Sequence, residues 1–273
     1  MRVDLDGRWS FEWLNGLQGV DLEALGAAGP QGDRQITVPG VWQLQGHGKP
    51  NYLANRFPPA LGTRRDRIPD IDPELNEAGV YARTFTVPPD WSTKRVTLVL
   101  EGVKAGASVV LNGRRVGYTQ GSFLPAEFDV TEHLVDGENR LTVVVLRYAA
   151  SSYLDGQDMW YLSGIFRPVY LRAEPRLAVR DVWARAQLGS TYTDGTLTTQ
   201  LSVVNHADVE ASAEVEVVLT EPGSGASRSV GPDTVTLGPG QESAVVLSTH
   251  LAQVSAWTAE TPHLYGVTVL LRR

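Results

Sequence analysis

The residues best suited to chemistry lie in the run Ser152–Trp160, which contains two carboxylates and an indole. Asp155 and Asp158 supply oxygen atoms that accept hydrogen bonds from hydroxyl groups. Trp160 has a flat apolar face that can stack on a ring. Each has a plainer interpretation: a solvated loop residue for either aspartate, and a core side chain for Trp160 and Met159.

Two other segments raise the question of a metal ion. His47 has no second histidine or acidic residue at ligand spacing, so a packing or surface histidine is expected. The acidic, proline-rich stretch Asp66–Glu74 lacks the glycine-centred loop of a calcium site and predicts a solvated surface loop. The chain also lacks a nucleophile-elbow pattern and a phosphate-cradling glycine loop.

Composition narrows the classes of function. A length of 273 residues favours two domains, and a single large all-β unit also fits. With 42% hydrophobic side chains the chain can form buried hydrophobic cores. The net charge of −7 argues against a phosphate-binding surface, so no nucleic-acid partner is expected. The absence of cysteine excludes disulfides, thiolate metal sites and cysteine nucleophiles. Met1–Asp6 does not resemble a signal peptide, and no stretch approaches a membrane span; we therefore expect a cytoplasmic protein without a membrane partner.

Short β-branched runs bounded by turn residues dominate the first part of the chain and predict a sandwich or jelly roll. The predicted strands are 84–87, 95–100, 107–111, 114–118, 139–147 and 167–172. Asn112-Gly113 predicts a tight hairpin. The apolar run 139–147 indicates a strand buried on both faces, and Thr131–Val135 is at most one helical turn.

Strict alternation of apolar and polar residues begins near Leu177 and predicts a second domain, giving domains 1–175 and 176–273. Its predicted strands are 181–188, 196–205, 211–219, 243–249 and 266–271. This pattern is typical of an immunoglobulin-like sandwich, which has about seven strands. Because only five or six are counted before Arg273, we expect this sandwich to be truncated at its C-terminus. The predicted fold class is therefore all-β throughout.

A series of runs occurs in an order and spacing that match one known family. They are Leu5–Phe11, Val38–Gln43, Gly46–Tyr52, Tyr81–Phe85, Glu101–Val103, Leu111–Arg114, Leu124–Val130, Gly137–Leu141, Ser152–Trp160 and Ser163–Arg167. The last two runs are the most specific. Over about its first 175 positions the chain resembles the front of glycoside hydrolase family 2, and within it the bacterial β-galactosidases. Trp257–Tyr265 extends a looser similarity into the second domain.

The resemblance implies a galactose-binding-like jelly roll, an immunoglobulin-like domain and then a (β/α)8 barrel carrying two catalytic glutamates. Both glutamates lie beyond this chain in the family pattern, so we expect the parent protein to be a glycosidase and the isolated chain to be inactive. Asp158 matches an aspartate that contacts the galactosyl hydroxyls and a sodium ion in an active site completed by the barrel. The expected partners are a β-galactoside and the barrel, in a homo-oligomer. No cofactor is expected in this chain alone, while sodium and magnesium are implied for the full-length enzyme.

Lys104 departs from the family pattern, in which asparagine follows Gly-Val at the substrate-facing end of the strand. An ammonium only donates hydrogen bonds, whereas an amide also accepts them. Lys104 is therefore predicted either to donate to a sugar hydroxyl or to pair with Asp158. We place Asp158, Lys104 and Trp160 together as the expected substrate-binding residues. Trp42 is interpreted as a packing residue, and Arg167 either pairs with a barrel carboxylate or lies free at the surface.

Three functions compete at this point: part of a β-galactosidase-type hydrolase, a stand-alone carbohydrate-binding module, and a structural spacer. A binding module would show several exposed aromatic residues on one sheet face, and the aromatic residues here are scattered along the sequence. The intact Asp158-Met159-Trp160 run argues against a spacer. The reading frame after Arg273 discriminates them, because the hydrolase requires several hundred further codons with alternating strand and helix patterns.

Overall fold

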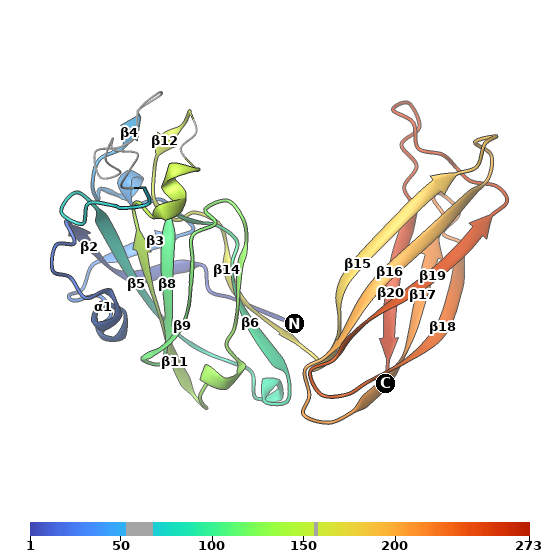
Figure 1. Cartoon of the computed structure of the whole chain (residues 1–273), viewed down its shortest axis with the longest axis horizontal. Coiled ribbons are helices and arrows are strands. Elements are labelled where there is room, and N and C mark those ends of the chain that lie inside the picture. The colour runs from blue at the N-terminus through green and yellow to red at the C-terminus, as the bar shows by residue number, and fades with distance from the viewer. Residues whose placement is uncertain (53–67, 156–157) are drawn as a thin grey trace. The chain divides into compact units, whose positions relative to one another are not determined.

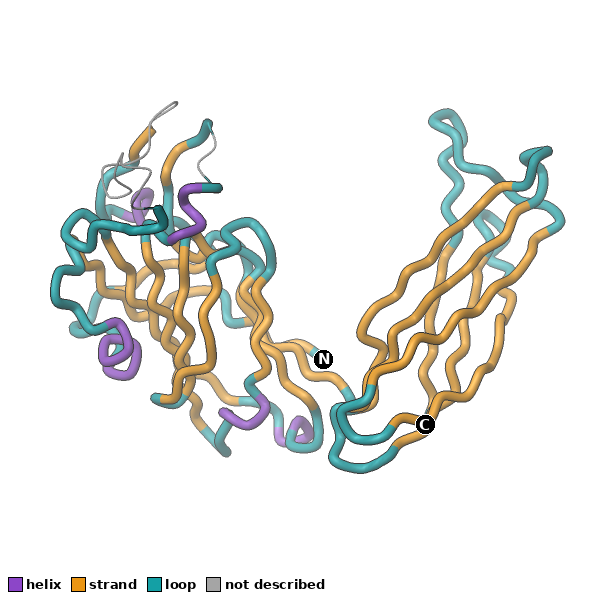
Figure 2. The backbone as a smooth tube through the Cα atoms, viewed as in Figure 1, coloured by secondary structure: helices purple, strands orange, loops and turns teal. Residues whose placement is uncertain are grey.

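Strands form wherever apolar and β-branched residues recur along the chain, and they make up most of both parts of the protein (Figures 1 and 2). The computed structural model describes residues 1–52, 68–155 and 158–273. The chain divides into two units, Met1–Glu174 and Pro175–Arg273. Both are built from antiparallel sheets packed as sandwiches, which confirms the all-β fold class.

The first unit contains a four-stranded sheet and a six-stranded sheet. The smaller has the order β1-β14-β6-β10, and the larger β3-β2-β5-β11-β8-β9. The strands of the smaller sheet are β1 (Arg2–Asp4), β14 (Val169–Glu174), β6 (Arg95–Leu100) and β10 (Ala126–Asp129). Those of the larger are β3 (Gln35–Val38), β2 (Gly7–Asn15), β5 (Glu77–Thr86), β11 (Glu138–Leu146), β8 (Gly106–Leu111) and β9 (Arg114–Thr119). Neighbours in both sheets run antiparallel, as expected of a jelly-roll sandwich.

The core of the first unit lies between its two sheets, where Trp9, Trp42 and Tyr81 are almost completely buried. Strand β11 is buried on both faces, as predicted from its apolar run. Val143 and the other core-facing side chains of β11 enter the main core, while Val144 packs into a smaller cluster on the opposite face. Burial on both faces explains why this strand lacks the alternation of a half-exposed strand.

Helix α1 (Leu22–Ala28) covers part of the outer face of the larger sheet and was not predicted. Asp21 caps it by accepting hydrogen bonds from the backbone N–H groups of Glu23 at 2.9 Å and Ala24 at 3.1 Å. Two turns are too short to show a clear helical period, so packing against β8, β9 and β11 stabilises it. No helix in the described part of the chain has the length and apolar character needed to cross a bilayer.

Shorter elements complete the first unit. Within residues 1–52, 68–155 and 158–174, the single helical turns are η1 (Trp42–Gln45), η4 (Pro89–Trp91), η5 (Thr131–His133) and η6 (Ala150–Tyr153). The turn η5 agrees with the single turn predicted at 131–135. Asn112 and Gly113 join β8 to β9 with φ values of 52° and 74°, which confirms the predicted hairpin because both residues tolerate the left-handed region.

The second unit consists of two three-stranded sheets around a core of its own. One sheet contains β15 (Leu177–Leu188), β16 (Gly195–Asn205) and β19 (Glu242–Leu251), in that order. The other has β17 (Ala211–Thr220) between β18 (Ser227–Leu237) and β20 (Gly266–Arg272). Five of these match predicted strands; β18 was missed because Gly231-Pro232 in its middle indicates a turn. The register of β17 against β18 shifts between Val215 and Val217, which lets the strand continue past the proline.

Candidate functional site

Two short strand ladders bring the candidate residues together at one end of the first unit. β4 (Asn51–Tyr52) pairs with β12 (Trp160–Tyr161), so that Tyr52 lies opposite Trp160 (Figure 1). β7 (Val103–Lys104) pairs with β13 (Gly164–Ile165), so that Lys104 lies opposite Gly164. Residues far apart in the sequence therefore meet beside the segment that carries Asp158.

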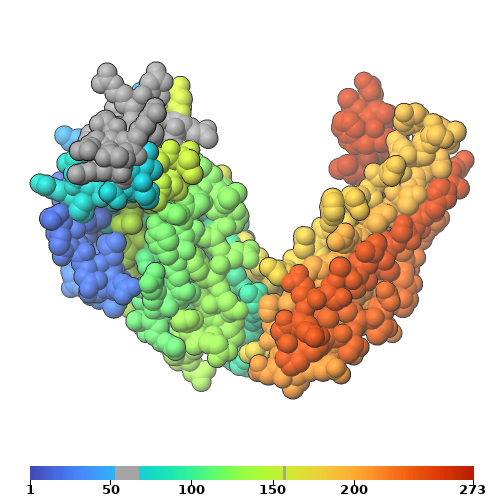
Figure 3. All heavy atoms as spheres, viewed as in Figure 1, coloured from blue at the N-terminus to red at the C-terminus, as the bar shows by residue number. Residues whose placement is uncertain are grey.

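The same end of the unit is joined to the segment that follows residue 68. Tyr153 Oη donates a hydrogen bond to the Asp70 carbonyl at 2.6 Å. Figure 3 shows the corresponding cyan and yellow-green atoms next to each other at the surface. Of the acidic stretch 66–74 predicted to be a surface loop, residues 66 and 67 lie outside the described residues, as do Gly156 and Gln157 of the 152–160 run. Glu74 is exposed, in agreement with that prediction.

Asp158 is exposed and accepts a hydrogen bond on Oδ1 from Tyr52 Oη at 2.6 Å. The carboxylate accepts this bond and repels the phenolate, and both effects raise the pKa of Tyr52 above its ordinary value. The phenol therefore stays protonated and directs its hydrogen at Asp158. Sequence reasoning missed Tyr52 as a functional residue, although it lies in the Gly46–Tyr52 run that carries the family resemblance.

Trp160 and Tyr52 form an exposed aromatic pair beside Asp158. The two residues are 56% and 48% exposed, and the ring centroids lie 5.6 Å apart with the planes inclined at 41°. Trp160 is thus a surface residue, and the interpretation as a core side chain is wrong for it. Met159, between Asp158 and Trp160, points the other way and is half-buried. The chain bends at residues 158 and 159, and β12 begins only at Trp160.

Lys104 is buried, with only 8% of its surface exposed. Its Nζ lies 3.5 Å from Met159 Sδ and 5.1 Å and 5.5 Å from the ring centroids of Phe123 and Tyr161. Burial lowers the pKa of this ammonium, and the Asp155 carboxylate acts in the opposite direction. Within the described residues no ion pair joins Lys104 to Asp158, so the predicted pairing is not what the structure has.

A buried ion pair connects the segments at this end of the unit. The Arg147 guanidinium contacts the Glu77 carboxylate, and their side chains are only 2% and 14% exposed. Arg147 Nη2 also donates to the Lys49 carbonyl at 2.7 Å, just before β4, and to the Tyr161 carbonyl at 3.4 Å in β12. Trp13 Nε1 donates to Glu77 Oε2 at 3.0 Å. Sequence reasoning missed this pair because only the folded sheet brings residues 77 and 147 together.

The remaining candidates, Trp42, His47 and Arg167, contact other residues of the first unit. Trp42 is fully buried, which confirms the packing interpretation. His47 lies 4.8 Å from the Phe11 ring, between centroids, and burial lowers its pKa. Arg167 is exposed, and its Nη1 donates to the Phe123 carbonyl at 3.0 Å. Arg167 thus holds the Phe123 loop of its own unit.

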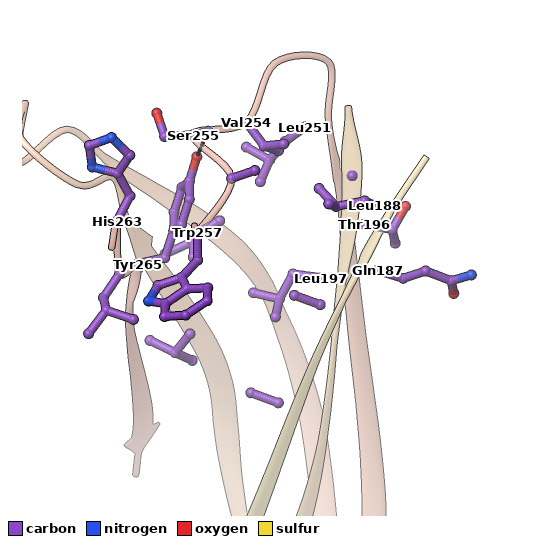
Figure 4. Close-up of a pocket in the computed structure, with 17 residues that line it drawn as sticks. Gln187, Leu188, Thr196, Leu197, Leu251, Val254, Ser255, Trp257, His263 and Tyr265 are labelled. Carbon is purple, nitrogen blue, oxygen red and sulfur yellow. Dashed lines mark hydrogen bonds between the residues drawn. The ribbon is translucent and has the colours of Figure 1, made fainter. Parts of the chain in front are cut away.

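The second unit contains a pocket of about 430 Å³ at one end of its sandwich (Figure 4). Its lining is mostly apolar and includes Leu188, Leu197, Val254, Trp257 and Tyr265. Tyr265 Oη accepts a hydrogen bond from the Ser255 backbone N–H at 3.0 Å, so this hydroxyl already has a partner within the lining. A sugar needs several hydrogen-bonding groups converging on its hydroxyls, and this pocket offers few. Asp158 and its neighbours are the better candidate site.

Comparison with known proteins also places a sugar-binding domain in the first unit, where Asp158 lies. The model of the glycosyl hydrolases family 2 sugar binding domain matches residues 3–175, and that of glycosyl hydrolases family 2 matches residues 177–273. The chain belongs to glycosyl hydrolase family 2. The predicted family is thus confirmed, and the candidate site lies in the sugar-binding domain of this family 2 chain.

Relatives of the family 2 chain are much longer than it is. A β-galactosidase of Vibrio vulnificus is 36% identical over 99% of this chain, which covers 26% of that protein. A β-galactosidase of Halalkalibacterium halodurans is 37% identical over 97% of this chain, covering 25% of that protein. The chain thus spans about a quarter of the length of these relatives.

Solved structures share the fold of both units. A β-glucuronidase of Bacteroides uniformis superposes with a TM-score of 0.76 over the whole of this chain, at 22% identity and over 30% of its own length. A β-glycosidase of Bacteroides vulgatus gives a TM-score of 0.68 at 20% identity, over the whole of this chain and 32% of its own. At such identities the likeness concerns the fold alone.

The contact between Tyr52 and Asp158 predicts a change in phenol titration. Asp158→Asn is expected to lower the pKa of Tyr52 towards the ordinary tyrosine value of about 10, because the amide carries no charge. The midpoint can be followed by NMR of tyrosine labelled at Cζ, with the signal of the exposed Tyr192 as internal reference. An identical Tyr52 midpoint in both proteins would contradict the hydrogen bond.

Proposed function

We propose that this family 2 chain is the non-catalytic, sugar-contacting part of a retaining β-galactosidase-type hydrolase. The observation that carries the proposal is the exposed Asp158 carboxylate, ordered by Tyr52 and placed beside the exposed Trp160. A carboxylate accepts hydrogen bonds from two vicinal sugar hydroxyls, and an indole stacks on the apolar face of a sugar ring. The resemblance of 152–160 to the β-galactosidases supports galactose as the sugar.

The hydrolytic step requires groups that this proposal places in a downstream (β/α)8 barrel. A retaining glycosidase uses a nucleophilic carboxylate and an acid/base carboxyl about 5–5.5 Å apart. The role of this chain is then to hold the substrate ring while the barrel attacks it. Uniform contacts to the ring lower KM, and contacts that strengthen as the ring distorts raise kcat.

The ions of the full-length enzyme are part of the same proposal. The Asp158 carboxylate, with the Tyr52 hydroxyl 2.6 Å away, offers hard oxygen donors of the kind that sodium takes, and the downstream domain would add others. The resemblance to the β-galactosidases implies magnesium for the full-length enzyme, and we assign it to the part outside this chain. We further propose a homo-oligomeric, cytoplasmic enzyme.

The isolated chain and the full-length protein are expected to differ completely in activity. Residues 1–273 alone should release no product from a chromogenic β-galactoside above a buffer blank, because neither barrel carboxyl is present. The full-length protein should hydrolyse the same substrate. Turnover by the isolated chain, or its absence in the full-length protein, contradicts the proposal.

The exposed Tyr52 and Trp160 pair favours one alternative, a stand-alone carbohydrate-binding module. A module binds sugar without help, whereas part of an active site binds weakly until the rest is present. Calorimetric titration of the isolated chain with galactose and lactose separates the two. Saturable binding that is lost in Trp160→Ala, together with an inactive full-length protein, would favour the module.

A further inference from the structure

The buried ammonium of Lys104 is an unusual feature of the first unit, because lysine is rarely buried to this degree. Its neighbours are a thioether, at 3.5 Å, and two aromatic rings. Sulfur is a weak acceptor, and aromatic faces attract a cation through their quadrupole. These contacts hold the charge in place while covering most of its surface.

The Asp155 carboxylate attracts this charge. Asp155 acts electrostatically on Lys104, and its own Oδ2 accepts a hydrogen bond from Ser122 Oγ at 2.7 Å. Ser122 is itself almost completely buried, so its hydrogen bond holds the Asp155 carboxylate against the interior of the unit. The hollow lined by Lys104, Asp155 and Tyr161 leaves no room for a sugar ring. Lys104 therefore lies behind the surface that carries Asp158, not on it.

The contacts of Lys104 reach the two residues that we propose to meet the sugar. Met159 lies between Asp158 and Trp160, and its sulfur touches the ammonium while its two neighbours are exposed. The ring of Phe123, which contacts the same ammonium, also contacts Phe166, whose ring centroid is 6.0 Å away. Lys104 thus ties strand β7 to the Phe123 loop and to the start of β12.

We propose that Lys104 is a positioning residue that fixes the backbone of Asp158 and Trp160 through Met159, Phe123 and Tyr161, and does not touch the sugar. The binding of a sugar by Asp158 and Trp160 rests on the proposed function, whereas the positioning of their backbone by Lys104 does not. An apolar side chain of similar length would fill the same space. It would lack the attraction to Asp155 and to the two rings, so the segment 158–161 would be held in one arrangement less strictly.

The positioning role of Lys104 is tested in the 273-residue chain by amide hydrogen exchange. The test variants are Lys104→Met and Lys104→Arg. The matched control is Lys94→Met, on the loop after η4. Lys104→Met should speed amide exchange in 158–161 at least tenfold while the strands β5 and β11 keep their protection. Lys104→Arg should restore rates to within threefold, since it keeps the charge, and Lys94→Met should change nothing. Unchanged exchange at 158–161, or an equal loss throughout the first unit, overturns the proposal.

Kinetics in the full-length protein separate this proposal from the proposed function. Lys104→Met should lower kcat/KM about tenfold, and its effect should be smaller in the Asp158→Asn background, because part of it is transmitted through the Asp158 carboxylate and the rest through Trp160. Fully multiplicative effects would overturn the coupling to Asp158. If the unaltered full-length protein does not hydrolyse β-galactosides, the proposed function fails. The hydrogen-exchange result still shows whether Lys104 positions segment 158–161.

Discussion

Replacing Asp158 with asparagine in the full-length protein is expected to lower kcat/KM for a β-galactoside about 10- to 100-fold. A hydrogen bond to a charged acceptor contributes about 1.5–3 kcal/mol, and each 1.4 kcal/mol corresponds to a factor of ten. Asparagine keeps the size of the side chain and can still meet Tyr52, so the change removes mainly the charge and one acceptor oxygen. The measurement is steady-state hydrolysis at several sodium concentrations, and the variant should respond less to sodium.

Asp136→Asn is the matched control, because Asp136 is an exposed aspartate in the turn before β11, at the opposite end of that strand from Arg147. It should leave kcat/KM unchanged. If Asp158→Asn shows the same activity and sodium response as the unaltered protein, Asp158 is an ordinary loop residue.

Replacing Arg147 with leucine is expected to destabilise the first unit by about 3–5 kcal/mol. The substitution leaves the Glu77 carboxylate buried without its cation, and removal of one partner from a buried pair has about this cost. It also removes the bond to the Lys49 carbonyl that fixes the approach to β4. Urea unfolding followed by far-UV circular dichroism should show the transition of the first unit moving to lower urea, while that of the second unit stays in place.

Arg115→Leu provides the comparison for that measurement. Arg115 pairs with Glu23 at 2.9 Å, but their side chains are 59% and 74% exposed, and such surface pairs contribute about 0–1 kcal/mol. If Arg147→Leu lowers the free energy of unfolding as little as Arg115→Leu does, water reaches the Glu77 carboxylate.

Local patterns predicted most of the strands. The runs 95–100 and 139–147 correspond to β6 and β11 because β-branched residues disfavour other conformations, and their turns contain residues that tolerate positive φ. Several elements were not predicted, among them the short strands β1, β3 and β10. At two others, α1 and β18, tertiary contacts outweighed local preference. Helix α1 is too short to show its period, and β18 continues through Gly231-Pro232 beside a register shift in β17.

The run 152–160 and the ordered runs around it determined the family and pointed to Asp158 from sequence alone, because a motif of fixed residue types is readable without a structure. The surroundings of each side chain were decided by the tertiary structure. Only the pairing of β4 with β12 places Tyr52 against Asp158 and leaves Trp160 exposed. Only the fold brings Met159, Phe123 and Tyr161 around the Lys104 ammonium and buries it. The physical reason is that alternation along a strand assigns side chains to opposite faces, whereas the fold of distant segments decides which face is covered.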